Sequence, residues 1–182
     1  TSPQSPFRIE KSDATTAEYN LGLAHGNPAV LAAILPLLQF AQFRQPAIDI
    51  LRPGLSWLLS QRFDPPREHC HFSALYGQDK GCRLGWCYGD LPIALLLARA
   101  AKLLDNVEYR QLASQISHSA TLRDATQGKV HDAGLCHGSA GVMLLFMLIN
   151  NQLNEVELSV ASGRWLQYTL QLYRAEGLTG LN

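Results

Sequence analysis

Gly134-Leu135-Cys136-His137-Gly138 places a thiol beside an imidazole, between two glycines and just ahead of an apolar run. Neighbouring residues on a regular helix point about 100° apart, because the helix has about 3.6 residues per turn. Cys136 and His137 can therefore bind one metal ion only from a turn. Glycine allows the backbone angles that such a turn needs. This stretch predicts a turn that presents two metal ligands at the start of a helix.

The same pattern occurs three times along the chain. Residues 22–26 (GLAHG), 85–89 (GWCYG) and 134–138 (GLCHG) are here called the first, second and third glycine turns. The intervals between them, 63 and 49 residues, each have room for two helices and their connections. A very apolar stretch follows each turn, and a more amphipathic one follows that. The repeat predicts inner helices packed against a ring of outer ones, with the turns gathered at one end.

The predicted fold class is all-α, because strand signals are nearly absent. A long loop is expected over residues 62–81, a short one over 126–132, and Pro53-Gly54 is expected to kink or interrupt the second helix. Residues 177–180 (GLTG) resemble the start of a fourth unit, so the ring is expected to be incomplete. Helices are expected over residues 29–43, 46–61, 91–104, 106–122, 142–149 and 155–174.

Composition narrows the classes of partner and the compartment. Of 182 residues 47% are hydrophobic, which suits one domain with a substantial core. Fifteen basic and fifteen acidic residues leave no net charge, so neither a nucleic-acid surface nor a polybasic membrane patch is expected. No apolar run reaches the roughly 18 to 20 residues of a transmembrane helix. Residues 1–20 are expected to be a linker or a cut boundary without a signal peptide, and residues 21–182 the folded domain. The four cysteines are then expected to be reduced or metal-bound in the cytoplasm.

Gathering the three turns at one end brings Cys87, Cys136, His137 and His25 together. Two thiolates and one imidazole form a set of three protein ligands that leaves the fourth tetrahedral position open, as in catalytic zinc sites. Thiolates are further favoured at helix N-termini by the helix dipole. The alternative for each cysteine is an inert place in the core, but three matching turns favour a metal.

The three turns, in this order and each ahead of an apolar helix, resemble the signature turns of the LanC-type lanthionine synthetases, or lantibiotic cyclases, and their LanC-like relatives. The resemblance covers residues 21–182 and implies an α/α toroid. It implies zinc-assisted addition of a peptide cysteine thiol to dehydroalanine or dehydrobutyrine, which closes (methyl)lanthionine thioether rings. It also implies that Cys87, Cys136 and His137 ligate Zn²⁺, and that His25, Arg83 and Tyr88 match further active-site positions.

The implied chemistry gives each residue a role. A free thiol, with a pKa near 8.5, is mostly protonated at neutral pH, and coordination to zinc deprotonates it. Attack on the β-carbon generates an enolate, which needs charge stabilisation and a proton. His25 would act as acid/base, Arg83 would stabilise the charge, and Tyr88 would orient or donate. The alternatives are that His25 caps the following helix, that Arg83 pairs with an aspartate (Asp79 or Asp90), and that Tyr88 only packs.

Other readings remain open for the function. The partner implied by the resemblance is a dehydrated precursor peptide, with a dehydratase as a further domain or partner. A second reading is a LanC-like enzyme that adds glutathione or another small thiol to dehydroamino acids, and a third is a non-catalytic zinc-binding scaffold or peptide-binding module. A toroid glycosidase would need paired carboxylates, whereas Asp90 is the only carboxylate beside a turn. The family's upstream acidic residue has no match, since Asp13 lies too close to His25. The chain is therefore expected to be a C-terminal portion of a longer enzyme.

Several histidines and cysteines lie outside the turns. His69-Cys70-His71 could form a second metal site or contact substrate, but its loop composition favours a solvated segment. Cys82 is expected to be a free thiol, which a neighbouring zinc could make reactive. His118 and His131 are expected on the surface.

Overall fold

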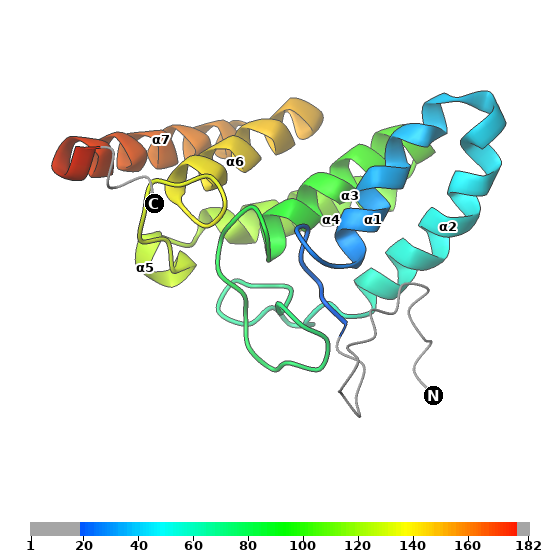
Figure 1. Cartoon of the computed structure of the whole chain (residues 1–182), viewed down its shortest axis with the longest axis horizontal. Helices are drawn as coiled ribbons and strands as arrows, with labels where there is room; N and C mark the ends of the chain where they lie inside the picture. Colours follow the sequence, from blue (N-terminus) through cyan, green and yellow to red (C-terminus); the bar gives the residue numbers. More distant parts are fainter. Residues whose placement is uncertain (1–18, 178–182) are drawn as a thin grey trace.

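The computed structural model describes residues 19–177, and these form helices joined by loops, with two isolated β-bridges (Figure 1). This confirms the all-α prediction. The predicted linker up to residue 18 and the predicted fourth turn beyond Gly177 lie outside the described residues. None of the helices in the described part is both long and apolar enough to cross a lipid bilayer. The helical elements are α1 (Asn27–Ile34), the 3-10 helix η1 (Leu35–Gln39), α2 (Ala41–Leu59), α3 (Asp90–Leu104), α4 (Val107–Thr121), α5 (Ala125–Gly128), α6 (Ser139–Leu153) and α7 (Val156–Glu176).

The helices pair as an inner and an outer set. Helices α1, α3 and α6 each follow a glycine turn, and α3 packs against both of the others. Each has an outer partner, α2, α4 and α7 respectively, as Figure 1 shows for α6 and α7. Ten of the fifteen residues of α3 are buried but only four of the fifteen in α4, which separates the inner from the outer layer. The glycine turns consequently lie at the N-terminal ends of neighbouring inner helices.

The first predicted helix was wrong in its extent. The α-helix ends at Ile34, and Leu35–Gln39 continues as a 3-10 helix before α2 begins at Ala41. Pro36 explains the change, because proline lacks an N–H and its ring clashes with the carbonyl four residues earlier. Pro53 does not interrupt α2, which continues to Leu59. Burial of the leucines around it (Leu51, Leu55, Leu58) offsets the lost backbone hydrogen bond.

Two smaller differences concern the third unit. Residues 126–128, the start of the loop expected over 126–132, belong to the short helix α5, which Asp124 opens through a capping box with Gln127. Helix α6 is longer than predicted and begins at Ser139, directly after the third glycine turn. The predicted loop over residues 62–81 contains no helix, and it pairs with the start of the described chain: Tyr76 N donates to Tyr19 O over 2.8 Å.

Candidate metal centre and active site

Backbone hydrogen bonds join the three glycine turns side by side. Ala24 N of the first turn donates to Cys87 O of the second over 3.3 Å, and Trp86 N of the second donates to Cys136 O of the third over 2.9 Å. The polar side chains of all three turns therefore belong to one small region at the ends of α1, α3 and α6. This is the gathering of turns that the repeat predicted.

Cys87, Cys136 and His137 come together in that region. One ligand atom from each lies within 4.8 Å of the other two, and residues 19–177 hold no other such group of three. Cys87 is buried, whereas Cys136 and His137 are exposed. The cluster is thus anchored on the buried thiol and open to solvent on the side of the third turn.

The Cys87 thiol is protonated at neutral pH in the absence of a cation. Burial, and after it the hydrogen bond and charge of the neighbouring Cys136, raise the pKa of Cys87 to about 11. Cys87 Sγ also lies 3.6 Å from the Cys136 carbonyl oxygen. A buried thiol whose ionisation is opposed by its neighbour favours a site in which a cation replaces the proton.

The donor set fits a zinc ion in number and in chemistry. Zinc binds thiolate at about 2.3 Å and imidazole at about 2.0 Å, which separates the ligand atoms of a tetrahedral site by roughly 3.5 to 3.8 Å. The atoms of Cys87, Cys136 and His137 lie within 4.8 Å of one another, so small side-chain movements would reach that spacing. Three protein ligands is the number that catalytic zinc sites use.

His25 and Tyr88 occupy the same place in their turns as His137 does in the third. His25 is exposed, and the cap residue of α1 is Gly26, with no side-chain hydrogen bond at that cap. The alternative that His25 caps the helix is therefore not supported. Tyr88 is half-buried, and its hydroxyl oxygen accepts a hydrogen bond from Asn20 Nδ2 over 3.0 Å.

Arg83 pairs with neither aspartate that the sequence offered. Its Nη2 donates to the carbonyl oxygen of Lys129 over 2.9 Å, so the guanidinium connects the residues just before the second turn to the segment after α5. Asp79 instead forms an ion pair with Arg67, and Asp90 with Arg123. Arg83 is half-buried.

Comparisons with known proteins identify the family and the fold. The model of the family "Lanthionine synthetase C-like protein" matches residues 4–180. The chain belongs to this LanC-like family. A solved structure of nisin cyclase superposes with a TM-score of 0.71 at 20% sequence identity, covering 90% of this chain and 42% of that chain. The likeness confirms the helical toroid, and the chain spans less than half the length of nisin cyclase.

Sequence reasoning missed a polar position that recurs in this LanC-like chain. The residue after each turn's last glycine is polar and buried: Asn27, Asp90 and Ser139 are 3%, 0% and 0% exposed. In the first and third units its backbone N–H closes the turn, since Asn27 N donates to Asn20 O and Ser139 N to Asp132 O. The signal was present in the repeat, because a polar residue opens each of the three apolar helices.

Asp90 anchors the long loop beneath the second turn. Its carboxylate accepts from the backbone N–H groups of His71 and Phe72 over 3.1 Å, and Arg123 Nη1 lies 3.9 Å from it. Burial raises the pKa of Asp90 to about 6, against the lowering effect of these backbone donors and of Arg123. A fully buried carboxylate with these partners does not face a cleft, so the glycosidase alternative has no support here.

The expectation of a solvated segment around His69-Cys70-His71 was wrong for two of its three residues. Cys70 and His71 are each 1% exposed, because Asp90 binds the Cys70 thiol and the His71 backbone N–H in the core, and His69 alone is exposed. No metal-type group forms there among the described residues. Burial and the charge of Asp90 raise the pKa of Cys70 to about 12.

The remaining histidines and the fourth cysteine are structural or peripheral. Cys82 is buried, and burial and Asp90 raise the pKa of its thiol to about 11, which disfavours reactivity. His118 is half-exposed, and its Nε2 lies 2.9 Å from Glu155 Oε2. His131 is exposed.

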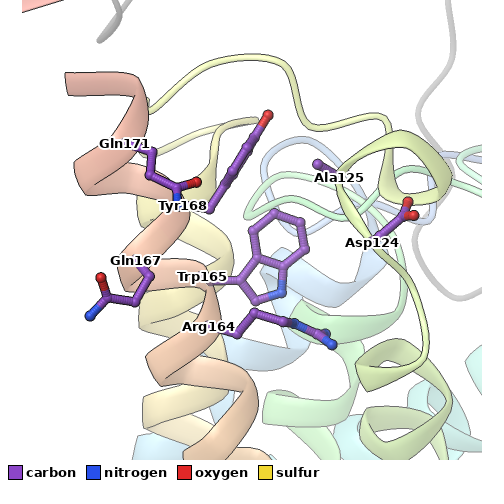
Figure 2. Close-up of a pocket in the computed structure, with 7 residues that line it drawn as sticks. All are labelled: Asp124, Ala125, Arg164, Trp165, Gln167, Tyr168 and Gln171. Carbon is purple, nitrogen blue, oxygen red and sulfur yellow. The ribbon is translucent and has the colours of Figure 1, made fainter. Parts of the chain in front are cut away.

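A pocket of about 440 Å³ lies away from the metal-type cluster. Figure 2 shows Trp165 and Tyr168 extending from α7 toward the start of α5, with their ring centroids 5.9 Å apart. None of the candidate site residues of the glycine turns lines it. The pocket is lined by Asp124, Ala125, Arg164, Trp165, Gln167, Tyr168 and Gln171.

Proposed function

We propose that this chain carries the zinc-binding part of an enzyme that adds cysteine thiols to dehydroalanine or dehydrobutyrine in a dehydrated peptide, closing lanthionine rings. The observation that carries the proposal is the cluster of Cys87, Cys136 and His137 on two hydrogen-bonded glycine turns. Family membership supports the class of reaction. Such a substrate requires a dehydration reaction on serine or threonine beforehand.

Cys87, Cys136 and His137 would hold Zn²⁺. When bound, zinc supplies deprotonation of a coordinated thiol, which turns a weak nucleophile into a thiolate at neutral pH. The three side chains bring two negative charges as ligands, so the loaded site is close to neutral and accepts one more anionic ligand. The exposed position of Cys136 and His137 leaves the open side facing solvent, where a peptide can approach.

The residues around the cluster supply the proton and the charge stabilisation. Attack of a thiolate on the β-carbon forms the C–S bond and moves the double-bond electrons onto the adjacent carbonyl oxygen. His25, exposed on the turn beside Cys87, would deliver a proton to the α-carbon. Arg83, two residues before the second turn, would stabilise the oxyanion by charge, and Tyr88, within that turn, by a hydrogen bond.

Metal content tests the site directly. Purified protein should hold about one zinc per chain, measured by inductively coupled plasma mass spectrometry, and Cys136→Ala or His137→Ala should lose it. His131→Ala is a matched control, because His131 is an exposed histidine near the third turn that lies outside the cluster. Full zinc retention in both ligand variants would overturn the site.

The reaction needs its own assay, because ring closure leaves the peptide mass unchanged. A peptide containing dehydroalanine and cysteine is incubated with the zinc-loaded chain and then treated with N-ethylmaleimide, which alkylates only unreacted thiols. Cyclisation is supported if the peptide escapes alkylation after incubation with the parent protein but is alkylated after incubation with Cys136→Ala. In a parallel reaction with added glutathione, the small-thiol alternative is favoured if the peptide gains the mass of one glutathione and its own cysteine stays open to alkylation.

A further inference from the structure

Backbone pairing fixes Asn20, two residues before the start of the first glycine turn. Leu21 N donates to Ala74 O over 2.9 Å, and Asn20 forms an isolated antiparallel bridge with Leu75. These contacts pair the residues that precede the turn with the long loop over residues 62–81. Backbone pairing on both sides therefore fixes the position from which the Asn20 side chain extends.

The orientation of the Asn20 amide follows from its two partners. Gly22 N lies 2.8 Å from one terminal atom of the side chain, and a backbone N–H only donates, so that atom is the oxygen. The amide nitrogen then faces Tyr88 Oη at 3.0 Å and donates to it. The Tyr88 oxygen is thus used as an acceptor, which leaves its own hydroxyl proton to be donated elsewhere.

We propose that Asn20 is a positioning residue that holds the Tyr88 hydroxyl as a hydrogen-bond donor for the reacting peptide. The inference rests on the proposed function and adds to it a residue outside the glycine turns. The Tyr88 ring lies directly against the first turn: a Cβ at Gly22 would fall 2.5 Å from its Cδ1 atom. Ring and hydroxyl are therefore both held, the ring by Gly22 and the oxygen by Asn20.

Comparison with the third turn shows that Asn20 does more than support the backbone of the first turn. There Asp132 Oδ1 accepts from Gly134 N over 2.7 Å, as Asn20 Oδ1 accepts from Gly22 N. An aspartate is therefore sufficient to close a turn of this kind. What the asparagine adds is an N–H donor, and that donor contacts Tyr88.

Asn20→Asp is the discriminating variant, because it keeps the acceptor for Gly22 N and removes the donor to Tyr88. An aspartate there would accept the phenol proton and reverse the direction of the hydrogen bond. Spectra of zinc-loaded protein labelled with ¹³C at tyrosine Cζ should show a shifted Tyr88 signal, assigned from Tyr88→Phe. The matched control is Asp132→Asn, which makes the reverse change in the third turn and should leave that signal in place. An unmoved Tyr88 signal in Asn20→Asp would overturn the proposal.

Rates of ring closure test the consequence for the reaction. Asn20→Asp should slow thioether formation about 10- to 100-fold, since misplacing a group by about an ångström costs on that order. In a Tyr88→Phe background the same substitution should have no further effect, whereas multiplying effects would show that Asn20 acts independently of Tyr88. Zinc content and thermal unfolding should match the parent protein. If the parent forms no thioether, the proposed function fails, while the tyrosine spectra still decide whether Asn20 orients the hydroxyl.

Discussion

Trp86 N donates to the carbonyl oxygen of Cys136 over 2.9 Å, and this bond sets the second and third glycine turns in register. Because Cys87 follows Trp86 directly, the two thiols of the cluster are positioned by one backbone hydrogen bond between turns. The approach is close at Gly85, where a Cβ would lie 3.2 Å from Cys136 O and 3.6 Å from the Cα of His137. Metal binding should therefore be sensitive to a single methyl group placed between the turns.

Gly85→Ala should weaken zinc binding without unfolding the chain. The added methyl group pushes the third turn by a few tenths of an ångström, which displaces Cys136 and His137 relative to Cys87. Zinc affinity should fall roughly tenfold or more, in the range seen when groups that orient metal ligands are altered. Competition with a chromophoric chelator measures it.

Gly163→Ala is the matched control for that experiment. Gly163 lies within α7, and a Cβ there meets nothing within 4 Å. It should stabilise the chain by about 0.5 to 1 kcal/mol through helix propensity and leave zinc affinity unchanged. Equal zinc affinities for Gly85→Ala and Gly163→Ala would contradict the role given to the contact between the turns.

Asp90→Ala should destabilise the fold by about 3 to 5 kcal/mol, because it leaves the buried Arg123 without its counter-ion and the backbone donors of His71 and Phe72 without an acceptor. Urea unfolding followed by circular dichroism measures the change. Asp124→Ala removes an exposed aspartate that caps α5 and should cost only about 1 kcal/mol. Similar costs for the two substitutions would show that Asp90 does not anchor the loop.

The glycine turns and the inner helices were predictable because their signals are local. Each turn is bracketed by glycines in the sequence, and the apolar stretch that follows marks the buried helix. Because the pattern repeats, it also predicts that Cys87, Cys136 and His137 gather at one end of the toroid. Of the kink or interruption predicted at Pro53, the interruption does not occur, because packing around the proline carries α2 through to Leu59.

Contacts between distant residues were not predictable in the same way. The bond from Asn20 to Tyr88 spans 68 residues, and nothing in either residue's neighbours selects the other as its partner. The segment around Cys70 and His71 has the composition of a solvated loop, but the buried carboxylate of Asp90 binds its backbone. Which backbone N–H groups a buried carboxylate binds depends on the packed fold. Composition alone therefore predicted the wrong burial for Cys70 and His71.

Asn106→Ala should cost about 1 kcal/mol of unfolding free energy, because Asn106 Oδ1 accepts from Tyr109 N at the first turn of α4. Asn106→Asp should retain most of the stability, since aspartate caps helices equally well. Asn151→Ala, at an exposed position within α6, is the matched control and should be neutral or slightly stabilising. Chemical denaturation of the three variants compares them.

His71 and Asp90 give opposite dependences of stability on pH. Burial, helped by the charge of Arg62, lowers the pKa of His71 from 6.5 to about 4, so its contribution is complete above pH 6.5 and is lost as the pH falls toward 4. Burial raises the pKa of Asp90 from 3.8 to about 6, so its contribution is complete below pH 3.8 and is lost as the pH rises toward 6. Between pH 4 and 6 the two effects largely cancel.

Substitution of His71 should leave the effect of Asp90 on the pH dependence of stability unopposed. In His71→Gln, the unfolding free energy relative to the parent should rise as the pH falls from 6.5 to 4, by up to about 1.4 kcal/mol per pH unit. Urea unfolding at half-unit intervals across that range measures the difference. His69→Gln, at an exposed histidine two residues away, is the matched control. A constant offset between parent and His71→Gln would mean that His71 titrates alike in the folded and unfolded chain, contrary to its burial against α4 through Ser119.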